Sequence, residues 1–330
     1  MVYILILNWN DAENTINCIK SIETNVVESK KIIILDNNSE DDSLQKIIEY
    51  VDKTHNRLKH YTRAVILDLW HSKIPIEDTE NMIIIKNDNN GGFAYGNNTG
   101  LMYSLLSKTC EYIWLLNVDT EINPKSLTEI IKLLKLKQNV GICGSILIDY
   151  YDRSLVQCYG GGNVFKYLGK TKLYLKNYPV ECINNIKHKA PSFLMGASLC
   201  IRKECLKAIG MMDEKFFMYS EEIAWQHNIK KSYGWEIDVA PESIVYHKGS
   251  VSSGGRSANF YYMLNKSSIM FIKSAFGMPT TIIASINLIF ISIIQNIKSY
   301  SKIKSSIRGV LDGLKANSKQ TIDNETIKRS

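Results

Sequence analysis

Short apolar runs alternate with stretches of helical periodicity through the first 136 residues, and this alternation constrains the fold more than any other feature. The apolar runs cover residues 2–7, 31–35, 82–85 and 112–116, and the helical stretches cover residues 12–24, 41–51, 96–107 and 124–136. Continuous apolar strands that alternate with helices are typical of a mostly parallel β-sheet covered by helices on both faces. We therefore predict an α/β fold with a Rossmann-like sheet of this kind.

Two parts of the chain depart from this alternation of strands and helices. Residues 55–80 are polar apart from a short apolar patch, and we interpret them as an insertion. Beyond residue 150 we expect a turn at 160–162, a strand over 193–201, a loop that becomes a helix over 216–231, and a strand over 235–239 that leads to Pro241 and His247. No internal repeat or low-complexity linker separates the two halves of the chain.

The formal net charge of +7 is concentrated at one end of the chain. Residues 298–330 contain eight basic and three acidic side chains, so the other 297 residues carry a net charge of only +2. This nearly neutral body gives no reason to expect nucleic acid as a partner. With 45% hydrophobic and 22% charged residues, the composition is that of a globular protein and excludes a disordered or collagen-like chain.

The cysteines and the N-terminal sequence both point to the cytoplasm. Seven cysteines are present, an odd number, and they form no C-x-x-C pattern, which is typical of reduced core cysteines in a cytosolic protein. The sequence MVYILILNWN enters a strand-like run at once, without a basic region or a cleavage site. We therefore expect no signal peptide.

Loops rich in Asn and Asp follow all four apolar runs. In a parallel sheet such loops meet at the carboxyl edge, where ligands bind. Loops rich in amides suit a polar ligand with several hydroxyls and a ring, although the same residues also serve as simple turn formers. Neither a G-x-G-x-x-G nor a Walker sequence occurs, so a nucleotide would be held by other means. The loops are Asn8-Trp9-Asn10, Asp36-Asn37-Asn38-Ser39, residues 87–98 with NNGGFAYGNN, and Asn117-Val118-Asp119-Thr120.

Several ionisable side chains stand where they could do chemistry. Asp119 lies two positions after Asn117 at the end of an apolar strand, where oxygen ligands could hold Mg²⁺ or Mn²⁺ against a diphosphate. Glu221 and Glu222 follow FFMYS and could supply a general base, or could simply begin a solvated helix. His247 ends a strand and precedes a Gly/Ser-rich stretch, although a lone histidine is more often structural.

Seven short motifs, in this order, resemble those of the family-2 glycosyltransferases. They are LNWN (7–10), DNNS (36–39), NGGFAYGNN (90–98), LNVDT (116–120), MGASLCIRK (195–203), FFMYSEE (216–222) and HKGS (247–250). The sequence looks most similar to the bacterial rhamnosyltransferase-like branch with the GT-A fold, over residues 1–265. The resemblance implies a nucleotide-binding half over residues 1–120, an acceptor half over 121–265, and a C-terminal helical segment over 266–330.

The resemblance also implies roles for individual residues. Glu222, or Glu221 in its place, would take the proton from the acceptor hydroxyl as that hydroxyl attacks the anomeric carbon in a single inverting displacement. Asp119 would hold a Mg²⁺ or Mn²⁺ ion that stabilises the leaving nucleoside diphosphate, and His247 would contact the metal or the diphosphate. The residues implied in donor binding are Asn8, Asn10, Asp36, Asn38, Asn90, Gly91, Gly92, Asn97, Asn117, Gly196 and Ala197.

The chain departs from the family's usual pattern at four positions. Val118 replaces the proline of Asn-Pro-Asp, and Glu222 replaces an aspartate. The longer side chain moves the carboxylate by about one carbon–carbon bond length. Ala224 and Asn228 stand where the family has an acid and an arginine, and we interpret this as the loss of a supporting ion pair. These departures keep an inactive or unusually specific member as an alternative.

Residues 278–297 are apolar and carry no charged side chain. Among them, Thr281, Ser285, Ser292 and Asn296 recur at intervals that place them on one helical stripe. About 20 residues could span a bilayer, but one crossing would separate the basic tail from cytosolic nucleotide-sugar. An amphipathic helix lying in the plane of an anionic membrane surface fits better. The alternative is a helix that packs on the enzyme or in a homodimer.

The sequence therefore predicts a transferase that moves a sugar from a nucleoside-diphosphate sugar to a glycan or lipid-linked glycan. A dTDP-rhamnose donor is suggested only by the branch that the motifs resemble. The expected location is cytoplasmic, peripheral at the inner face of the cell membrane. Two alternatives stay open, namely a glycan-binding scaffold that kept the fold and a sugar nucleotidyltransferase. The latter would need a Gly-rich basic phosphate loop, which residues 7–14 lack.

Overall fold

The computed structural model describes residues 1–55, 58–77, 79–185, 190–249 and 257–316. Its strands are β1 (Val2–Asn8), β2 (Lys30–Asp36), β3 (Leu58–Thr62), β4 (Met82–Lys86), β5 (Tyr112–Asn117), β6 (Thr120–Ile122), β7 (Val140–Asp149), β8 (Val156–Tyr159), β9 (Gly161–Phe165), β10 (Lys170–Leu173), β11 (Phe193–Leu194), β12 (Ser198–Arg202) and β13 (Glu236–His247). Its helices are α1 (Ala12–Asn25), α2 (Ser43–Thr54), α3 (Arg63–His71), α4 (Gly92–Leu106), α5 (Ser126–Leu136), the 3₁₀ helix η1 (Val180–Asn185), α6 (Lys203–Ile209), α7 (Glu221–Gln226), α8 (Ile229–Tyr233), α9 (Ala258–Gln295) and α10 (Tyr300–Lys315).

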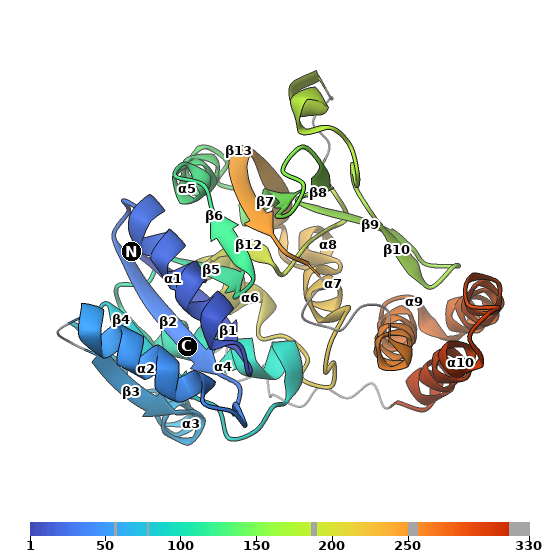
Figure 1. The fold of residues 1–330 in the computed structure, drawn as a ribbon, viewed down its shortest axis with the longest axis horizontal. Helices are drawn as coiled ribbons and strands as arrows, with labels where there is room; N and C mark the ends of the chain where they lie inside the picture. The colour runs from blue at the N-terminus through green and yellow to red at the C-terminus, as the bar shows by residue number, and fades with distance from the viewer. Residues whose placement is uncertain (56–57, 78, 186–189, 250–256, 317–330) are drawn as a thin grey trace.

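A ten-stranded sheet forms the centre of the molecule, in the order β3-β4-β2-β1-β5-β12-β7-β13-β6, with β8 paired to β7 (Figure 1). The five strands from β3 to β5 are all parallel. β12 is antiparallel to β5 and β7, and β13 is parallel to β7. The strand order reverses between β1 and β5, which is where open parallel sheets bind ligands. The predicted fold class is confirmed.

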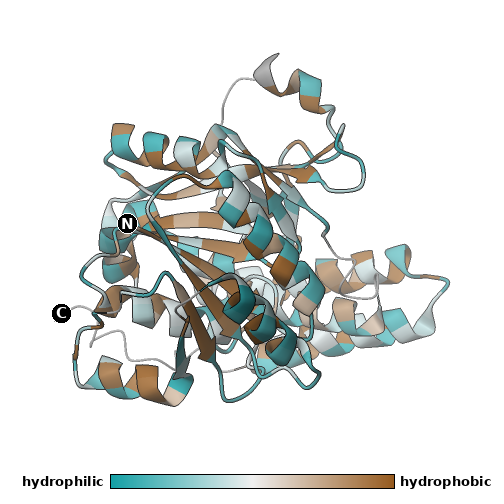
Figure 2. Ribbon diagram, turned by 60° about the vertical axis from the view of Figure 1, so that its left-hand side comes forward, coloured by the Kyte–Doolittle hydropathy of each residue, from teal (hydrophilic) through white to brown (hydrophobic). Residues whose placement is uncertain are grey.

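Helices cover both faces of this sheet. Ile4 and Ile6 of β1 pack in the same apolar layer as α1, α2 and α5, whereas Tyr3 and Leu5 pack in the layer of α3, α4 and α6. Because β1 is buried on both faces, its sequence is a continuous apolar run rather than an alternating one. Figure 2 shows apolar strands at the centre and helices that carry both apolar and polar residues. Six of the seven cysteines are buried, and none is paired.

Residues 58–71, which we interpreted only as part of an insertion, form strand β3 and helix α3. β3 pairs in parallel with β4 at the edge of the sheet, and all of its side chains are half-buried or exposed. An edge strand of this kind needs no apolar run, so the sequence pattern gave no signal for it. α3 packs Ile66 and Trp70 into the apolar layer that also contains α4.

The glycines near residue 160 and the strand predicted over 193–201 need correction. Gly161 and Gly162 belong to strand β9 and not to a turn; only Gly160, with φ of 71°, has a turn-like backbone. A Cβ atom on Gly161 would lie 1.8 Å from the carbonyl oxygen of Phe193 on β11, so this glycine permits a close strand approach. The strand predicted over 193–201 is divided into β11 and β12 by residues 195–197.

Strand β13 does not stop at residue 239, as the sequence suggested, but continues through Pro241 to His247. The pairing of β13 with β7 shifts register between Ala240 and Ile244, so Pro241 sits in a bulge. A proline is tolerated there because the residues of a bulge are not paired with the neighbouring strand. Its nitrogen, which carries no hydrogen, therefore does not have to donate a hydrogen bond. The uninterrupted strand brings His247 beside β6.

The C-terminal helices α9 and α10 pack against each other at one side of the molecule (Figure 1). α9 is broken at Gly277, where φ is 76°. The first half of α9 shares an apolar cluster with Phe216 and Ile223, just before and within α7. Because α9 begins at Ala258, the expected boundary at residue 265 falls inside a helix. The end of the basic tail (317–330) and the Gly/Ser-rich stretch 250–256 lie outside the described residues.

Candidate functional site

The loops after β1 and β2 are joined by side-chain hydrogen bonds. The parallel register places Asn8 opposite Asp36, and Asn8 Nδ2 donates to Asp36 Oδ1 at 2.9 Å and to Ser39 Oγ at 3.0 Å. Ser39 donates to Asp36 from its backbone nitrogen at 3.1 Å and from its hydroxyl at 2.6 Å. Asp36 is fully buried, so its carboxylate fixes the two loops in place.

Asn10 and Asn38 set the backbone path of these loops. Their φ angles are 52° and 59°, in the left-handed region that asparagine tolerates better than most residues. The Asn10 nitrogen donates to Ser39 Oγ at 3.0 Å, and Asn10 Oδ1 accepts from the Glu40 nitrogen at 2.8 Å. Both asparagines therefore shape the same edge of the sheet.

The loop after β4 is held by Asn37, a residue that the motif analysis did not assign to the site. Asn37 Nδ2 donates to Asn90 Oδ1 at 2.9 Å and to the carbonyl of Gly92 at 3.2 Å. Gly92 has a φ of 90°, and a Cβ atom there would lie 1.8 Å from the carbonyl oxygen of Phe217. The Phe93 nitrogen donates to that same oxygen at 3.0 Å. Gly92 thus lets α4 meet the segment that leads to Glu221.

Gly91, the residue just before α4, and Asn97, within α4, have different roles. A Cβ atom on Gly91 would lie 2.3 Å from the ring of Tyr95, so this glycine makes room for that ring. Asn97 is 1% exposed, and its Nδ2 donates to the carbonyl of Phe93 at 3.0 Å within α4. The structure therefore uses Asn97 inside the helix and does not present it at the edge of the sheet.

Gly196 and Ala197 connect the two halves of the sheet edge. They lie between β11 and β12, and the carbonyl of Ala197 accepts from the Asn117 nitrogen at 3.2 Å. A Cβ atom on Gly196 would lie 2.9 Å from the ring of Phe93 at the start of α4. The predicted residues from β4 onward thus converge around the ends of β5 and β11.

Asp119 and His247 face each other at the end of β5. Pairing of β13 with β6 puts His247 opposite Thr120, and His247 Nε2 lies 3.2 Å from Asp119 Oδ1. The other ring nitrogen, Nδ1, is 2.6 Å from Gln157 Oε1, an atom that can only accept, so we assign the proton to Nδ1. Asn117 Nδ2 lies 3.5 Å from Nε2. Gln157, on β8, carried no signal in the sequence.

A cavity of about 420 Å³ opens beside Asp119, between α1 and the end of β5. Lys248 lines this cavity; its backbone nitrogen donates to the carbonyl of Asp119 at 3.0 Å, and its ammonium donates to Asn14 Oδ1 at 2.6 Å. The Lys248 ammonium also lies 4.8 Å from the ring centre of Tyr150. The cavity therefore places two carboxylates, Asp119 and Glu121, and two cations, Lys20 and Lys248, around a space large enough for a polar ligand.

Glu221 and Glu222 begin the short helix α7. The Oε2 atom of each is buried and has no hydrogen-bond partner among the described residues. Burial raises the pKa of Glu222 to about 7. Burial, and then the charge of Glu222, raises the pKa of Glu221 as well. A carboxyl that titrates near neutral pH is suited to accept a proton from a hydroxyl and to release it again.

The backbone before these glutamates is strained. Tyr219 and Ser220 have φ angles of 69° and 66°, which cost energy in residues other than glycine and persist only where the surroundings enforce them. The first half of α9 supplies that support, because Ser267 Oγ donates to the carbonyl of Met218 at 2.7 Å and Phe260 packs edge-on against Tyr219. The left-handed backbone at residues 219–220, held by these contacts with α9, sets the direction in which α7 and its two carboxylates begin.

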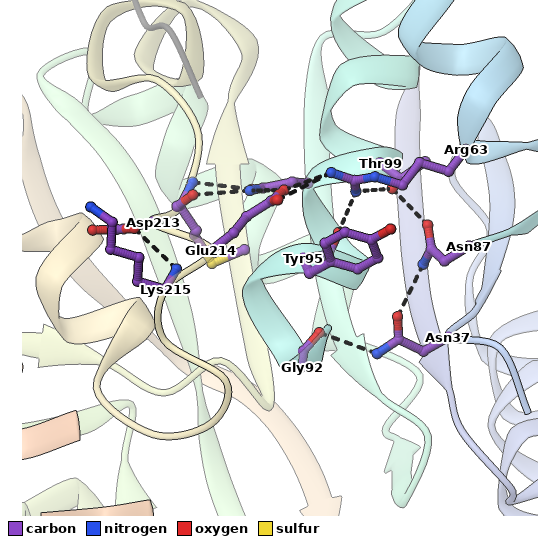
Figure 3. Close-up of polar contacts among 11 residues, drawn as sticks. Asn37, Arg63, Asn87, Gly92, Tyr95, Thr99, Asp213, Glu214 and Lys215 are labelled. Carbon is purple, nitrogen blue, oxygen red and sulfur yellow. Dashed lines mark hydrogen bonds and ion pairs between the residues drawn. The ribbon is translucent and has the colours of Figure 1, made fainter. Parts of the chain in front are cut away.

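A buried polar network lies behind the loops, centred on Arg63 from the segment that we interpreted as an insertion (Figure 3). Arg63 stacks on the ring of Tyr95 at 3.7 Å and makes an ion pair of 2.9 Å with Glu214. Arg63 also donates to Thr99 Oγ1 at 2.7 Å, and Thr99 donates to Asn87 at 2.7 Å. Asn87 in turn donates to Asn37 at 3.2 Å, so the network ends at the residue that holds the loop after β4.

Solved structures share this fold at low sequence identity. The mannosyltransferase PcManGT from Pyrobaculum calidifontis, in complex with GDP-Man and Mn²⁺, is 12% identical with a TM-score of 0.54, over 95% of this chain and 85% of that one. Residues 1–349 of TarS from S. aureus, in complex with UDP-GlcNAc, are 13% identical with a TM-score of 0.52, over 95% of this chain and 80% of that one. GalNAc-T7 with UDP, GalNAc and Mn²⁺ is 12% identical with a TM-score of 0.55, over 92% of this chain and 58% of that one.

Sequence comparisons agree with this likeness. The low-salt glycan biosynthesis hexosyltransferase Agl10 of Haloferax volcanii is 22% identical over 214 residues, and the match spans 64% of this chain and 64% of the length of that relative. Residues 3–189, more than half of the chain, match the sequence profile described as Glycosyl transferase family 2. The chain therefore belongs to glycosyl transferase family 2.

Proposed function

We propose that this protein is an inverting glycosyltransferase that moves a sugar from a nucleoside-diphosphate sugar to an acceptor hydroxyl. The observation that carries the proposal is the pairing of Asp119 with His247, 3.2 Å apart at the carboxyl end of β5 and beside a cavity of about 420 Å³. The buried carboxyls of α7, linked to the same edge through Gly92 and Phe217, complete the arrangement.

The donor is proposed to lie along the loops that end β1, β2 and β4. Asn8, Asn10, Asp36, Asn38, Asn90, Gly91, Gly92, Asn117, Gly196 and Ala197 would bind it or shape its site, and Asn97 would support them from within α4. This assigns residues 1–120 to the nucleotide and residues 121–257 to the acceptor, and the C-terminal helical segment then begins at Ala258 with α9. Solved relatives of this fold contain GDP-Man or UDP-GlcNAc, whereas a dTDP-rhamnose donor rests on the motif resemblance alone.

The donor set of the site fits a divalent cation. Asp119 Oδ1 and His247 Nε2 face each other while Gln157 holds the opposite ring nitrogen, which is the arrangement that orients a metal-binding imidazole. Asp119 and His247 would hold Mg²⁺ or Mn²⁺, and the ion would offset the charge of the leaving diphosphate. Two of the solved relatives contain Mn²⁺.

Glu222 is proposed as the base, with Glu221, whose pKa is raised first by burial and then by the charge of Glu222, as its neighbour. Glu222 is half-buried whereas Glu221 is 5% exposed, so a substrate reaches Glu222 more easily. In the reaction the acceptor oxygen forms a bond to the anomeric carbon as the bond from that carbon to the diphosphate oxygen breaks. The acceptor proton passes to Glu222, and the nucleoside diphosphate leaves with the bonding electron pair.

The acceptor is proposed to be a glycan or a lipid-linked glycan. The Haloferax relative is named for glycan biosynthesis, which agrees with such an acceptor. A cytoplasmic enzyme held at the inner face of the cell membrane would meet both a soluble nucleotide-sugar and an acceptor anchored in lipid.

The proposal is tested by release of nucleoside diphosphate from a panel of nucleotide-sugars with Mg²⁺ or Mn²⁺. We expect turnover with at least one donor, loss of turnover on chelation, and a fall of about 10²–10⁴-fold in Asp119→Asn. Asp52→Asn, an exposed position on α2, is the matched control and should keep full activity. Full activity in Asp119→Asn would refute the site assignment.

A second candidate, a glycan-binding scaffold, is favoured by one observation. Ala224 packs against the apolar cluster around Phe216, and Asn228 is exposed at the start of α8, so the ion pair expected from the family pattern is replaced by packing. Donor or glycan binding in calorimetry without any turnover would select this function. Release of pyrophosphate from a nucleoside triphosphate and a sugar phosphate would instead identify a nucleotidyltransferase.

A further inference from the structure

The second half of α9, after the break at Gly277, is amphipathic with its polar side inward. Thr281, Ser285, Ser292 and Asn296, which the sequence places on one stripe, are all buried. Ser285 Oγ donates to the carbonyl of Thr281 at 2.8 Å, and Ser292 Oγ accepts from Asn265 of the first half of α9 at 3.2 Å. The enzyme thus occupies the polar side of this helix.

The outward side of the same helix segment is apolar up to Gln295, the exposed polar residue at its end. Its exposed residues recur at helical spacing and therefore line one face. Their exposed fractions run from 39% to 74%. The residues are Met278, Ile282, Ile283, Ile286, Phe290, Ile293, Ile294 and Ile297.

A second segment, more than one hundred residues earlier, extends this surface. The turn between β9 and β10 exposes Phe165, Tyr167 and Leu168. It lies against α9, because Asn287 Nδ2 donates to the carbonyl of Tyr167 at 2.9 Å, and the hairpin reaches toward the C-terminal helices in Figure 1. We call the seven outward residues of α9, Ile297 just beyond its end, and these three residues together the docking face. Exposed apolar side chains gathered in this way mark an interaction surface.

Basic side chains border the docking face, and acidic ones are absent from its two segments. The β9–β10 hairpin carries Lys166 in its turn and Lys170 and Lys172 on β10, and the helix end is followed by Lys298 and Lys302. Neither residues 163–173 nor residues 274–311 contain an aspartate or a glutamate. Lys170 Nζ donates to Gln295 Oε1 at 3.0 Å, which joins the turn to the end of the helix. An apolar centre with a basic rim matches acyl chains beneath anionic headgroups.

We propose that the docking face seats the protein on an anionic phospholipid membrane, with the second half of α9 lying in the plane of the surface. α9 is long and apolar enough to cross a membrane by length and composition. The break at Gly277 leaves only 278–295 as one straight segment, and its buried polar side packs against the first half of α9. Docking by one face is therefore the arrangement that keeps those contacts. Two copies joined through this face would bring two basic rims together, which like-charge repulsion opposes.

The experiment is co-sedimentation of the full chain with vesicles of phosphatidylcholine alone or with phosphatidylglycerol added. We expect binding to the anionic vesicles that weakens as salt is raised. The double variant Ile286→Glu/Phe290→Glu should lower the partition coefficient by at least about tenfold, because two embedded apolar side chains become charged. Leu136→Glu, an equally exposed apolar position on α5, is the matched control and should bind as the native protein does.

The basic rim has its own test. Lys166→Gln and Lys298→Gln should each weaken binding to anionic vesicles by about fivefold and leave binding to neutral vesicles unchanged. No sedimentation of the native protein with either kind of vesicle would overturn the proposal. A dimer in vesicle-free buffer that the Ile286→Glu/Phe290→Glu variant abolishes would assign the face to a second copy instead.

This inference goes beyond the proposed glycosyl transfer, and its test does not depend on that reaction. Sedimentation needs no donor, acceptor or metal. The docking-face variants should release nucleoside diphosphate at the native rate with a water-soluble acceptor, since none of the substituted residues lies in the proposed active site. Loss of vesicle binding with retained turnover, or the reverse, therefore separates the two proposals.

Discussion

Replacement of Glu222 by glutamine tests the acid–base argument most directly, because the raised pKa makes separate predictions for activity and for stability. Burial raises the pKa of Glu222 from 4.5 to about 7. The base must be ionised to accept a proton, so kcat/KM should rise with pH along a limb centred near pH 7. In Glu222→Gln we expect kcat to fall by about 10²–10⁴-fold and this limb to disappear.

The stability prediction follows from the same shift with its sign worked out. Between about pH 4.5 and pH 7 the folded protein holds the proton of Glu222 while the unfolded chain has lost it. The free energy of unfolding therefore falls as the pH rises through this window. At about 1.4 kcal/mol per pKa unit, the full shift corresponds to a loss of about 3 kcal/mol, and water that reaches the half-buried side chain makes this an upper value. The glutamine in Glu222→Gln cannot ionise, so the free energy of unfolding of this variant should not show this fall.

The assay is urea unfolding of the native protein and of Glu222→Gln at several pH values from 5 to 8. The difference in unfolding free energy between the two proteins should grow with pH in favour of Glu222→Gln. Glu242→Gln, at an exposed position on β13, should follow the native curve. Two results would contradict a raised pKa of Glu222. One is a difference in unfolding free energy between the native protein and Glu222→Gln that does not change with pH. The other is a rise of kcat/KM with pH that is complete below pH 5. Loss of activity only in Glu221→Gln would move the base to Glu221.

Three further predictions concern residues around the site. Gly92→Ala should lower the melting temperature and the donor affinity together, because φ is 90° and the added Cβ would meet the Phe217 carbonyl; a native melting temperature would contradict this. Gln157→Leu should raise the Mn²⁺ concentration for half-maximal activity by about 10–100-fold, since it no longer orients His247; an unchanged metal titration would count against the metal site. Arg63→Met should cost about 3–5 kcal/mol in urea unfolding because it leaves the Glu214 carboxylate, only 12% exposed, without its cationic partner. Adding Glu214→Leu should recover part of that loss, and additive losses would show that the two residues act independently.

The central strands and their loops could be predicted from the sequence because their signals are local. A strand buried on both faces must be apolar along its whole length, and this requirement made β1, β2, β4 and β5 visible. β3 was not predicted as a strand because an edge strand can remain polar, without an apolar run. β13 was cut short because proline normally ends a strand, and only the bulge at residues 240–244 shows why it does not here.

The site could be predicted only in part from the sequence, because its residues come together through contacts between distant segments. Motifs identified Asp119 and His247 separately, but only the pairing of β6 with β13 brings them together, from positions far apart in the chain. Gln157, Arg63 and Glu214 belong to no local pattern, since each acts through partners contributed by other elements. Asn97 lies within a motif, and only the structure shows that its side chain donates to the Phe93 carbonyl inside the helix.

Local patterns were enough to predict the central strands and most of the helices, the polar loops at the carboxyl edge, and an apolar helix near the C-terminus. Periodicity carries that information because burial acts on each segment separately. Which polar groups meet, and which way the last apolar helix faces, depends instead on packing between segments that lie far apart in the chain. The sequence showed a polar stripe on that helix; the structure buried the stripe against Asn265 and left the apolar face outside. A helix has two faces, and the elements that pack against it determine which of them is covered.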